Sequence, residues 1–168
     1  MLYSGALVNV LDLVPQDIDI RDIAHALALT NRFGGHSRVP LSVAQHSVDV
    51  SRICGSLQGL LHDASETYLR DIPQPLKCLP MFEDYRKREA WLQRMIYAKY
   101  GCPVADAPAV VDADAFMLRW EAWYSFKKPS WCERPGTPPP ITFPITPWEP
   151  WTWDRAEAEF LSRFKELS

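Results

Sequence analysis

The chain has 168 residues, the usual length of one domain and enough to bury a sizeable core. Hydrophobic residues make up 47% of it, and seven Trp, six Tyr and seven Phe exclude a disordered tail. The formal net charge of -3 excludes a basic surface that binds duplex nucleic acid by charge alone, so any phosphate site needs locally placed cations.

The first half of the chain predicts a short extended segment followed by three helices. Residues 3–13 are apolar with polar interruptions, which favours an extended segment or small hairpin lying against the core. Helical spacing of apolar residues predicts a helix from Asp19 to about Asn31, with Asp17 or Asp19 as its N-cap. Ser42 caps a second helix, and a third carries residues 60–68.

The second half predicts two longer amphipathic helices, at about residues 81–100 and 105–126, and a closing helix at 154–167. In the 105–126 helix the predicted core positions are Val110, Val111, Ala115, Leu118 and Ala122. Eight prolines in residues 129–150 exclude a helix there and predict a structured wrap or a linker, and the interspersed tryptophans favour the packed wrap. The expected fold is an all-α bundle of about six helices, in a single domain spanning residues 1–168.

Residues 60–77 concentrate side chains of the types that bind metal ions and phosphate. They are, in order, His62, Asp63, Glu66, Asp71 and Lys77. The imidazole and carboxylate ligands of one divalent cation normally come from different helices. His46 in the second helix, and Asp112 or Asp114 in the fifth, could therefore complete a four-ligand set with His62 and Asp63.

Each of these residues, taken alone, also has a simpler explanation. A His-Asp dipeptide is frequent by chance, and a helical histidine such as His46 is more often a hydrogen-bonded core residue. Asp114 alone suits an N-cap or a salt bridge, and Asp71 suits a turn. Arg32 and Lys77 could be solvated surface charges. The interpretation depends on the ordered combination of residues.

Five short stretches between Asp19 and Phe126 supply that combination. They are Asn31-Arg32-Phe33, Val43-Ala-Gln-His46-Ser, Leu61-His62-Asp63-Ala-Ser-Glu66, Asp71-Ile-Pro-Gln-Pro-Leu-Lys77 and Asp112-Ala-Asp114-Ala. In this order they resemble the HD-domain phosphohydrolases, in the bacterial 5'-deoxynucleotidase branch, and are similar to the small phage-encoded deoxyadenosine triphosphohydrolases. The resemblance implies an all-α HD-domain helical bundle, the same class that the helical spacing predicts.

The resemblance also implies a role for each matching residue. The implied metal ligands are His46, His62, Asp63 and Asp114, with Asp112 as a lesser candidate. Such a set accepts Zn²⁺, Co²⁺, Mn²⁺ or Fe²⁺, and an additional Mg²⁺ is compatible with it. Glu66 and Asp71 are the implied catalytic residues that manage protons. Arg32, Phe33 and Lys77 are the implied substrate-binding residues, although Phe33 stands where the deoxynucleotidase branch typically has tryptophan.

The implied reaction is metal-dependent hydrolysis of a 2'-deoxynucleotide, with a purine such as dATP favoured. Water activated by the ion attacks phosphorus next to the deoxyribose and yields the deoxynucleoside plus triphosphate or phosphate. A 5'-deoxynucleotidase restricted to monophosphates is the alternative. An alternative of another class is a non-catalytic module that binds nucleotide or a partner through the Pro/Trp-rich segment, but the complete ligand set argues against it.

The cysteines and the hydropathy pattern bear on location. The four cysteines form no C-x-x-C pair, and the sequence shows no signal peptide and no apolar run long enough to cross a bilayer. We therefore expect a cytoplasmic protein with reduced thiols, in the host cytoplasm if it is phage-encoded, and no membrane partner. We also expect a homo-oligomer.

Overall fold

A computed structural model describes residues 1–126 and 149–168. Within these residues the chain is helical, and its one pair of bridged extended residues is Asn31 with Ser42. This confirms the predicted all-α class. Most of the segment predicted as a Pro/Trp-rich wrap falls on residues 127–148, outside the described residues.

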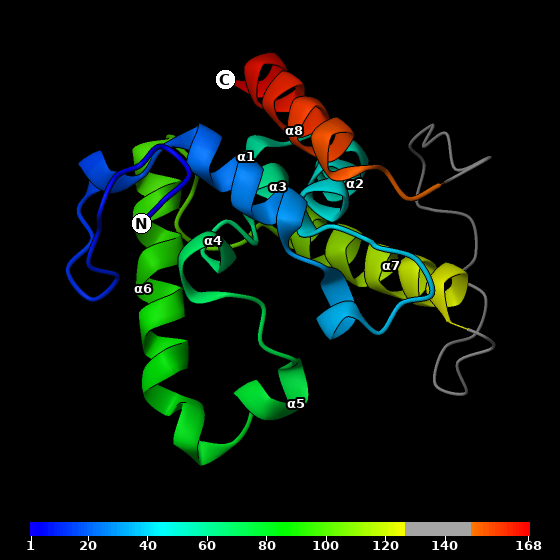
Figure 1. Cartoon of the computed structure of the whole chain (residues 1–168), viewed down its shortest axis with the longest axis horizontal. Coiled ribbons are helices and arrows are strands. Elements are labelled where there is room, and N and C mark those ends of the chain that lie inside the picture. Colours follow the sequence, from blue (N-terminus) through cyan, green and yellow to red (C-terminus); the bar gives the residue numbers. More distant parts are fainter. Residues whose placement is uncertain (127–148) are drawn as a thin grey trace.

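The described part of the chain contains five longer helices and three short ones (Figure 1). The longer helices are α1 (Ile20–Leu29), α2 (Val43–Cys54), α6 (Glu83–Lys99), α7 (Pro108–Ser125) and α8 (Trp153–Leu167). The short ones are α3 (Leu57–Leu61), α4 (Glu66–Leu69) and α5 (Gln74–Lys77). Single 3-10 turns lie at Pro15–Asp17, Arg32–Gly35 and Pro80–Phe82.

The starts of α1 and α2 follow the predicted caps. The side chain of Asp19 accepts a hydrogen bond from the backbone N–H of Arg21, and that of Ser42 accepts one from Gln45. Helix α1 ends two residues before the predicted Asn31, because the backbone there is extended and pairs with the residues that precede α2. This pairing brings the 3-10 turn containing Arg32 close to the start of α2.

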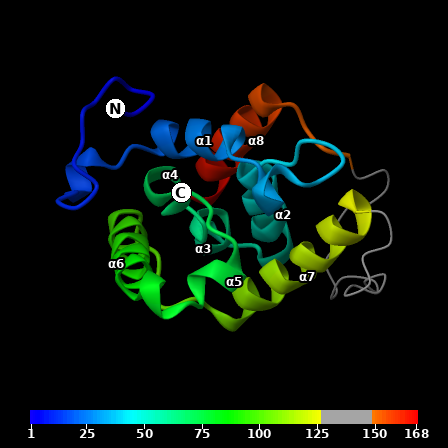
Figure 2. The same ribbon diagram turned by 60° about the horizontal axis from the view of Figure 1, so that its bottom comes forward.

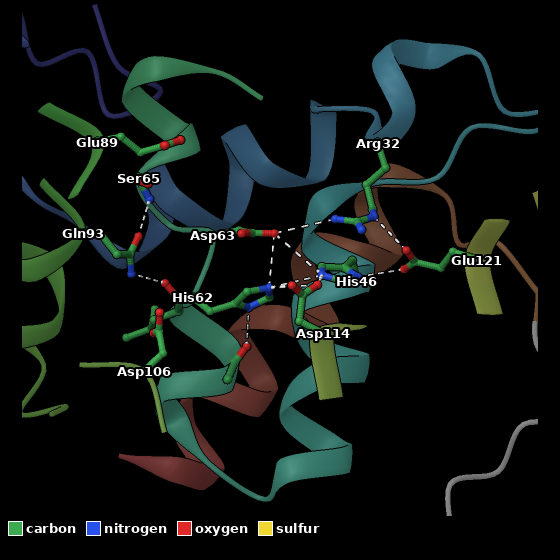
Figure 3. Close-up of polar contacts among 12 residues, drawn as sticks. Arg32, His46, His62, Asp63, Ser65, Glu89, Gln93, Asp106, Asp114 and Glu121 are labelled. Atoms are coloured by element: carbon green, nitrogen blue, oxygen red, sulfur yellow. Dashed lines mark hydrogen bonds and ion pairs between the residues drawn. The ribbon is translucent and has the colours of Figure 1, made fainter. Parts of the chain in front are cut away.

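The single helix predicted over residues 60–68 is wrong, because α3 and α4 replace it. Between them the backbone forms hydrogen bonds at three-residue spacing instead of helical ones. Gln93 of α6 stabilises this turn: it accepts a hydrogen bond from the N–H of Ser65 at 3.0 Å and donates one to the carbonyl of Leu61 at 2.7 Å (Figure 3). His62 and Asp63 therefore lie in a turn between two helices.

The predicted core face of α7 is partly wrong. Val110 and Ala122 are buried, but Ala115 is exposed, Val111 is 54% exposed and Leu118 is 40% exposed. The buried residues of α7 are Val110, Ala113, Phe116, Met117, Glu121, Ala122 and Ser125. Because α7 carries apolar residues on more than one side, the spacing alone does not select the face that packs against α2.

The main core lies between α1, α2, α3, α6 and α8. Fully buried side chains from each of these helices meet there, including Leu27, Val48, Leu61, Ile96 and Phe160. Helix α8 packs on α1 and α2 (Figures 1 and 2). A bidentate contact holds the chain that leads into α8: the buried amide of Gln45 bonds to the carbonyl of Glu149 and the N–H of Trp151.

The N-terminal segment lies against α1 without forming a strand in residues 1–18. The backbone N–H and hydroxyl of Ser4 both donate to the buried carboxylate of Asp22, at 2.6 and 2.9 Å. Val8 and Val10 pack on the main core, as expected of a covering segment. Within residues 1–126 and 149–168, no helix combines the length and apolarity needed to cross a membrane.

Candidate metal centre

Two imidazoles and two carboxylates from α2, α7 and the turn after α3 converge at one point (Figure 3). The Nε2 of His46 on α2 lies 3.2 Å from the Nε2 of His62, which follows α3. The Oδ1 of Asp114 on α7 lies 3.1 Å from the same His46 atom. One ligand atom each from His46, His62 and Asp114 fall within 4.8 Å of one another, so this group could hold a metal ion.

Asp63 borders this group, whereas Asp112 does not. The Oδ2 of Asp63 lies 3.3 Å from the Nε2 of His62 and 3.7 Å from that of His46. Asp112 is exposed on α7 and is absent from the cluster. The structure therefore brings together the four residues predicted as ligands and leaves the lesser candidate outside.

Hydrogen bonds fix the orientation of both imidazole rings. The Nδ1 of His46 lies 2.9 Å from a carboxylate oxygen of Glu121, and the Nδ1 of His62 lies 2.8 Å from the carbonyl of Gly59. Both partners are acceptors, so in each ring Nδ1 carries the proton and donates it. The two Nε2 atoms therefore face the cluster, and in the neutral rings their lone pairs are available to an ion, the arrangement that metal-binding histidines adopt.

The cluster is buried on one side and accessible on the other. Its side chains range from 0% exposed for His46 and 8% for His62 to 24% for Asp63 and 45% for Asp114. A solute can therefore approach from the side of the two carboxylates. An open side leaves room for solvent beside a bound ion, as a catalytic metal site requires.

The charges of the cluster favour bound positive charge. Burial opposes protonation of His62, but the carboxylates of Asp63 and Asp114 outweigh it and raise the pKa of His62 well above its usual value. The pKa of His46 is raised in the same way, against burial and the charge of Arg32, chiefly by Glu121 and Asp114. Conversely, the histidines lower the pKa values of Asp63 and Asp114 although burial acts to raise them.

Arg32 lies directly beside the cluster. Its Nη1 lies 3.6 Å from Asp63, and its Nε donates to Glu121 at 2.8 Å. The guanidinium is 12% exposed; burial acts to lower its pKa, but the surrounding carboxylates, Glu121 first, raise it. The predicted phosphate-binding cation is therefore held in place beside a proposed ligand.

Glu121 is the member of this arrangement that sequence reasoning missed. It is fully buried and contacts both His46 and Arg32. A signal was present, because Glu121 follows Asp114 by seven residues, two turns along the same side of a helix. Its partners lie 75 and 89 residues away in the sequence, so only the fold reveals the contacts.

Phe33 follows Arg32 in a left-handed backbone conformation, with φ of 57°. Its ring makes an edge contact with Phe126, 5.1 Å between centroids, and lies 5.5 Å from the guanidinium of Arg32. A non-glycine residue in this conformation is uncommon, and such strain concentrates at functional sites. The structure thus places the predicted aromatic residue against the predicted phosphate-binding arginine.

Glu66 at the start of α4 is a buried carboxyl group. It is 7% exposed, and its Oε2 has no hydrogen-bond partner within the described residues. Burial, followed by the charges of Asp63 and Asp71, raises the pKa of Glu66 to about 9. Burial also raises the pKa of Asp71, against the opposing effects of Arg32 and Lys77. Both predicted catalytic carboxyls therefore lie within electrostatic range of the cluster.

Lys77 is paired with a residue of α6. Its Nζ lies 2.6 Å from the Oε1 of Glu89, which also accepts a hydrogen bond from the hydroxyl of Tyr85 at 3.3 Å. Burial acts to lower the pKa of Lys77, but Glu89 raises it, with smaller contributions from Glu66 and Asp63. The predicted second cation is therefore near the site but already neutralised by a partner.

Comparisons with known proteins define the family of the chain. No family model matches it. It is 37% identical over 161 residues to the uncharacterized protein YfdR of Escherichia coli K12, covering 90% of this chain and 85% of YfdR. It is 34% identical over 137 residues to the uncharacterized protein RCAP_rcc00048 of Rhodobacter capsulatus, covering 72% of this chain and 69% of that protein. The chain therefore belongs to the protein family that includes YfdR.

Proposed function

We propose that this protein is an HD-domain, metal-dependent phosphohydrolase that cleaves 2'-deoxynucleotides at the phosphoester next to the deoxyribose. The observation that carries the proposal is the orientation of the two histidines, whose Nε2 atoms face two carboxylates on the accessible side of the cluster. Two imidazoles and two carboxylates suit Zn²⁺, Co²⁺, Mn²⁺ or Fe²⁺. The proposed ligands are His46, His62, Asp63 and Asp114.

A divalent ion bound by these residues supplies a Lewis acid for the phosphoryl oxygen and lowers the pKa of water. The remaining chemistry belongs to the side chains around it. Arg32 donates charge-assisted hydrogen bonds to the phosphate oxygens, and its own orientation is maintained by Glu121. Phe33 offers an aromatic face beside this arginine for the nucleoside.

Glu66 and Asp71 have complementary roles in the proposed reaction. Glu66 accepts the proton of the attacking water through its free Oε2, and Asp71 protonates the 5' oxygen as its bond to phosphorus breaks. Without an added cation, Glu66 keeps its own proton at neutral pH. Positive charge near Asp63 favours the carboxylate form, which is the form that can accept a proton.

One contact favours the narrower alternative, a 5'-deoxynucleotidase restricted to monophosphates. Lys77 is the cation proposed to contact phosphate groups, and Glu89 neutralises it at 2.6 Å. A triphosphate would need this pair to separate, whereas a monophosphate could be held by Arg32 and the ion. The identity of the phosphate product therefore distinguishes the two reactions.

The test is hydrolysis of a panel of deoxynucleoside mono- and triphosphates, with ribonucleotides beside them, by protein loaded with Co²⁺, Mn²⁺ or Zn²⁺. Chromatography of the products separates triphosphate release from phosphate release. Asp114→Ala should lose both ion binding and activity, while Asp112→Ala, an exposed aspartate two residues away, should keep both. Glu66→Ala should bind the ion and react slowly. Absence of turnover across the panel by ion-loaded protein contradicts the proposal and favours a binding module.

A further inference from the structure

We propose that Glu121 is a positioning residue that couples ion binding at His46 to phosphate binding at Arg32. The inference rests on the proposed function in assigning phosphate to Arg32. It adds that the two halves of the site are not independent, because one buried carboxylate orients both. An ion at the cluster should therefore strengthen the binding of phosphate, and phosphate should strengthen the binding of the ion.

The first support is the way the carboxylate is used. Its Oε1 lies 2.9 Å from the Nδ1 of His46, and its Oε2 lies 2.8 Å from the Nε of Arg32. Figure 3 shows one side chain reaching both partners. Glu121 is fully buried, so water does not compete for either oxygen. A shift of His46 or Arg32 therefore moves the Glu121 carboxylate and changes the hydrogen bond to the other residue.

The second support is the chemistry of the two partners. Both His46 and Arg32 present an N–H group to Glu121, so the residue between them must offer two acceptors. A carboxylate does this, whereas an amide has one acceptor and one donor. Glutamine at position 121 could satisfy one partner only and would turn an N–H group toward the other. Glu121→Gln thus breaks one of the two contacts, to His46 or to Arg32, with almost no change in the size of the side chain.

The third support is a ring of polar contacts around the site. Arg32 lies 3.6 Å from Asp63, and Asp63 lies 3.7 Å from His46, so these three residues form a ring with Glu121. Helix α7 supplies both Glu121 and Asp114, two turns apart. Movement of α7 would therefore shift a proposed ligand and the shared acceptor together.

The experiment is a double-mutant cycle read by ion affinity. Co²⁺ is titrated into the wild type, Arg32→Ala, Glu121→Gln and the double variant, and its visible spectrum reports the occupancy and geometry of the site. Glu121→Gln should weaken Co²⁺ binding by about 10- to 100-fold, the usual range for the acceptor of a ligating histidine. Arg32→Ala changes the Co²⁺ affinity by some factor in the wild type and by another in Glu121→Gln. The factor in Glu121→Gln should be at least threefold smaller than that in the wild type. Equal effects of Arg32→Ala in both backgrounds would overturn the coupling.

Phosphate binding gives the reciprocal readout. Titration of inorganic phosphate in the presence and absence of Co²⁺ should show that Co²⁺ strengthens phosphate binding in the wild type by a larger factor than in Glu121→Gln. An equal factor in both proteins would also overturn the proposal. Neither readout requires turnover, so a wild type that binds Co²⁺ and phosphate without hydrolysing nucleotides contradicts the proposed function and leaves the coupling open to this test.

Two further variants separate positioning from folding. Glu157→Gln is the matched control, because Glu157 also pairs with a histidine Nδ1, that of His25 at 2.9 Å, on other helices. It should leave Co²⁺ affinity within twofold. Glu121→Asp keeps the charge and both acceptors on a shorter side chain, and it should recover part of the Co²⁺ affinity lost in Glu121→Gln. If Glu121→Gln does not fold, the cycle is run with Glu121→Asp and judged by the same comparison.

Discussion

The carbonyl of Gly59 accepts the Nδ1–H of His62 at 2.8 Å, and Gly59 itself lies where α3 packs against the end of α2. A Cβ atom at position 59 would overlap the Sγ of Cys54 and lie 3.3 Å from the Cα of Ser51. The absence of a side chain thus permits the close approach of α2, which carries His46, and α3, which directly precedes His62. Gly59 thus orients the His62 ring through its carbonyl and allows α3 to pack against α2.

Gly59→Ala should therefore weaken both the fold and the ion site. We expect a loss of about 1–3 kcal/mol in the free energy of unfolding, the usual cost of adding a methyl group to a closely packed contact. Urea denaturation of the ion-free protein measures it. Cys54→Ala combined with Gly59→Ala removes the overlap with sulfur and should recover part of the loss. Unchanged stability and Co²⁺ affinity in Gly59→Ala would show that α3 can move without consequence.

Local signals explain which elements of the fold were predictable. Asp19 and Ser42 were identifiable as caps because a cap depends on residues within one turn. The break between α3 and α4 depends on Gln93, which lies 28 residues after Ser65, so helical spacing missed it. The exposed side of α7 was misassigned because Val111 and Leu118 are apolar and yet lie on the surface.

In the candidate site, too, the residue types could be predicted from the sequence, whereas the contacts between distant residues could not. His46, His62 and Asp114 were singled out as metal-ligating side chain types on separate predicted helices, and the fold brings them together. Glu121 was missed because its importance lies in two contacts across the fold. The pairing of Lys77 with Glu89 was equally invisible, since a lysine in a proline-containing loop is solvated by default. Spacing thus located the group that could hold a metal, whereas its supporting contacts required the structure.

Ion binding should release protons. Asp63 and Asp114 raise the pKa of His62 well above its usual value against the effect of burial, so His62 of the ion-free protein holds its proton to a higher pH than a free imidazole. A metal ion requires the neutral imidazole, and the proton must leave. The affinity for Co²⁺ should therefore rise with pH and level off above the pKa of His62. Calorimetric titration in buffers of different ionisation enthalpy measures the protons released, and a buffer-independent enthalpy would contradict this expectation.

The Lys77–Glu89 pair should restrain anion binding. Glu89→Gln removes the charge that neutralises Lys77 and should strengthen tripolyphosphate binding severalfold, whereas Lys77→Ala should weaken it. Both side chains are largely buried, at 14% and 21% exposed, so we expect Glu89→Gln to cost about 1 kcal/mol of stability. Calorimetry and thermal denaturation provide the two measurements. Tripolyphosphate affinities that are the same in all three proteins would place Lys77 outside the substrate site.

The stability of the ion-free protein should fall with rising pH because of Glu66. Burial, followed by Asp63 and Asp71, raises its pKa from 4.5 to about 9, so the folded state holds a proton that the unfolded state has released. The stabilisation is fully present below about pH 4.5 and is lost as the pH rises toward 9. The slope from this one group is at most about 1.4 kcal/mol per pH unit.

Glu66→Gln isolates this contribution, because glutamine keeps the size of the protonated side chain and does not titrate. Urea denaturation at intervals from pH 5 to 8.5 should show the ion-free wild type losing stability relative to Glu66→Gln as the pH rises. Addition of Co²⁺ should flatten the difference, since positive charge near Asp63 stabilises the Glu66 carboxylate. A constant difference between the two ion-free proteins across this range would mean that Glu66 is already ionised, and its proposed activation by the cation would be wrong.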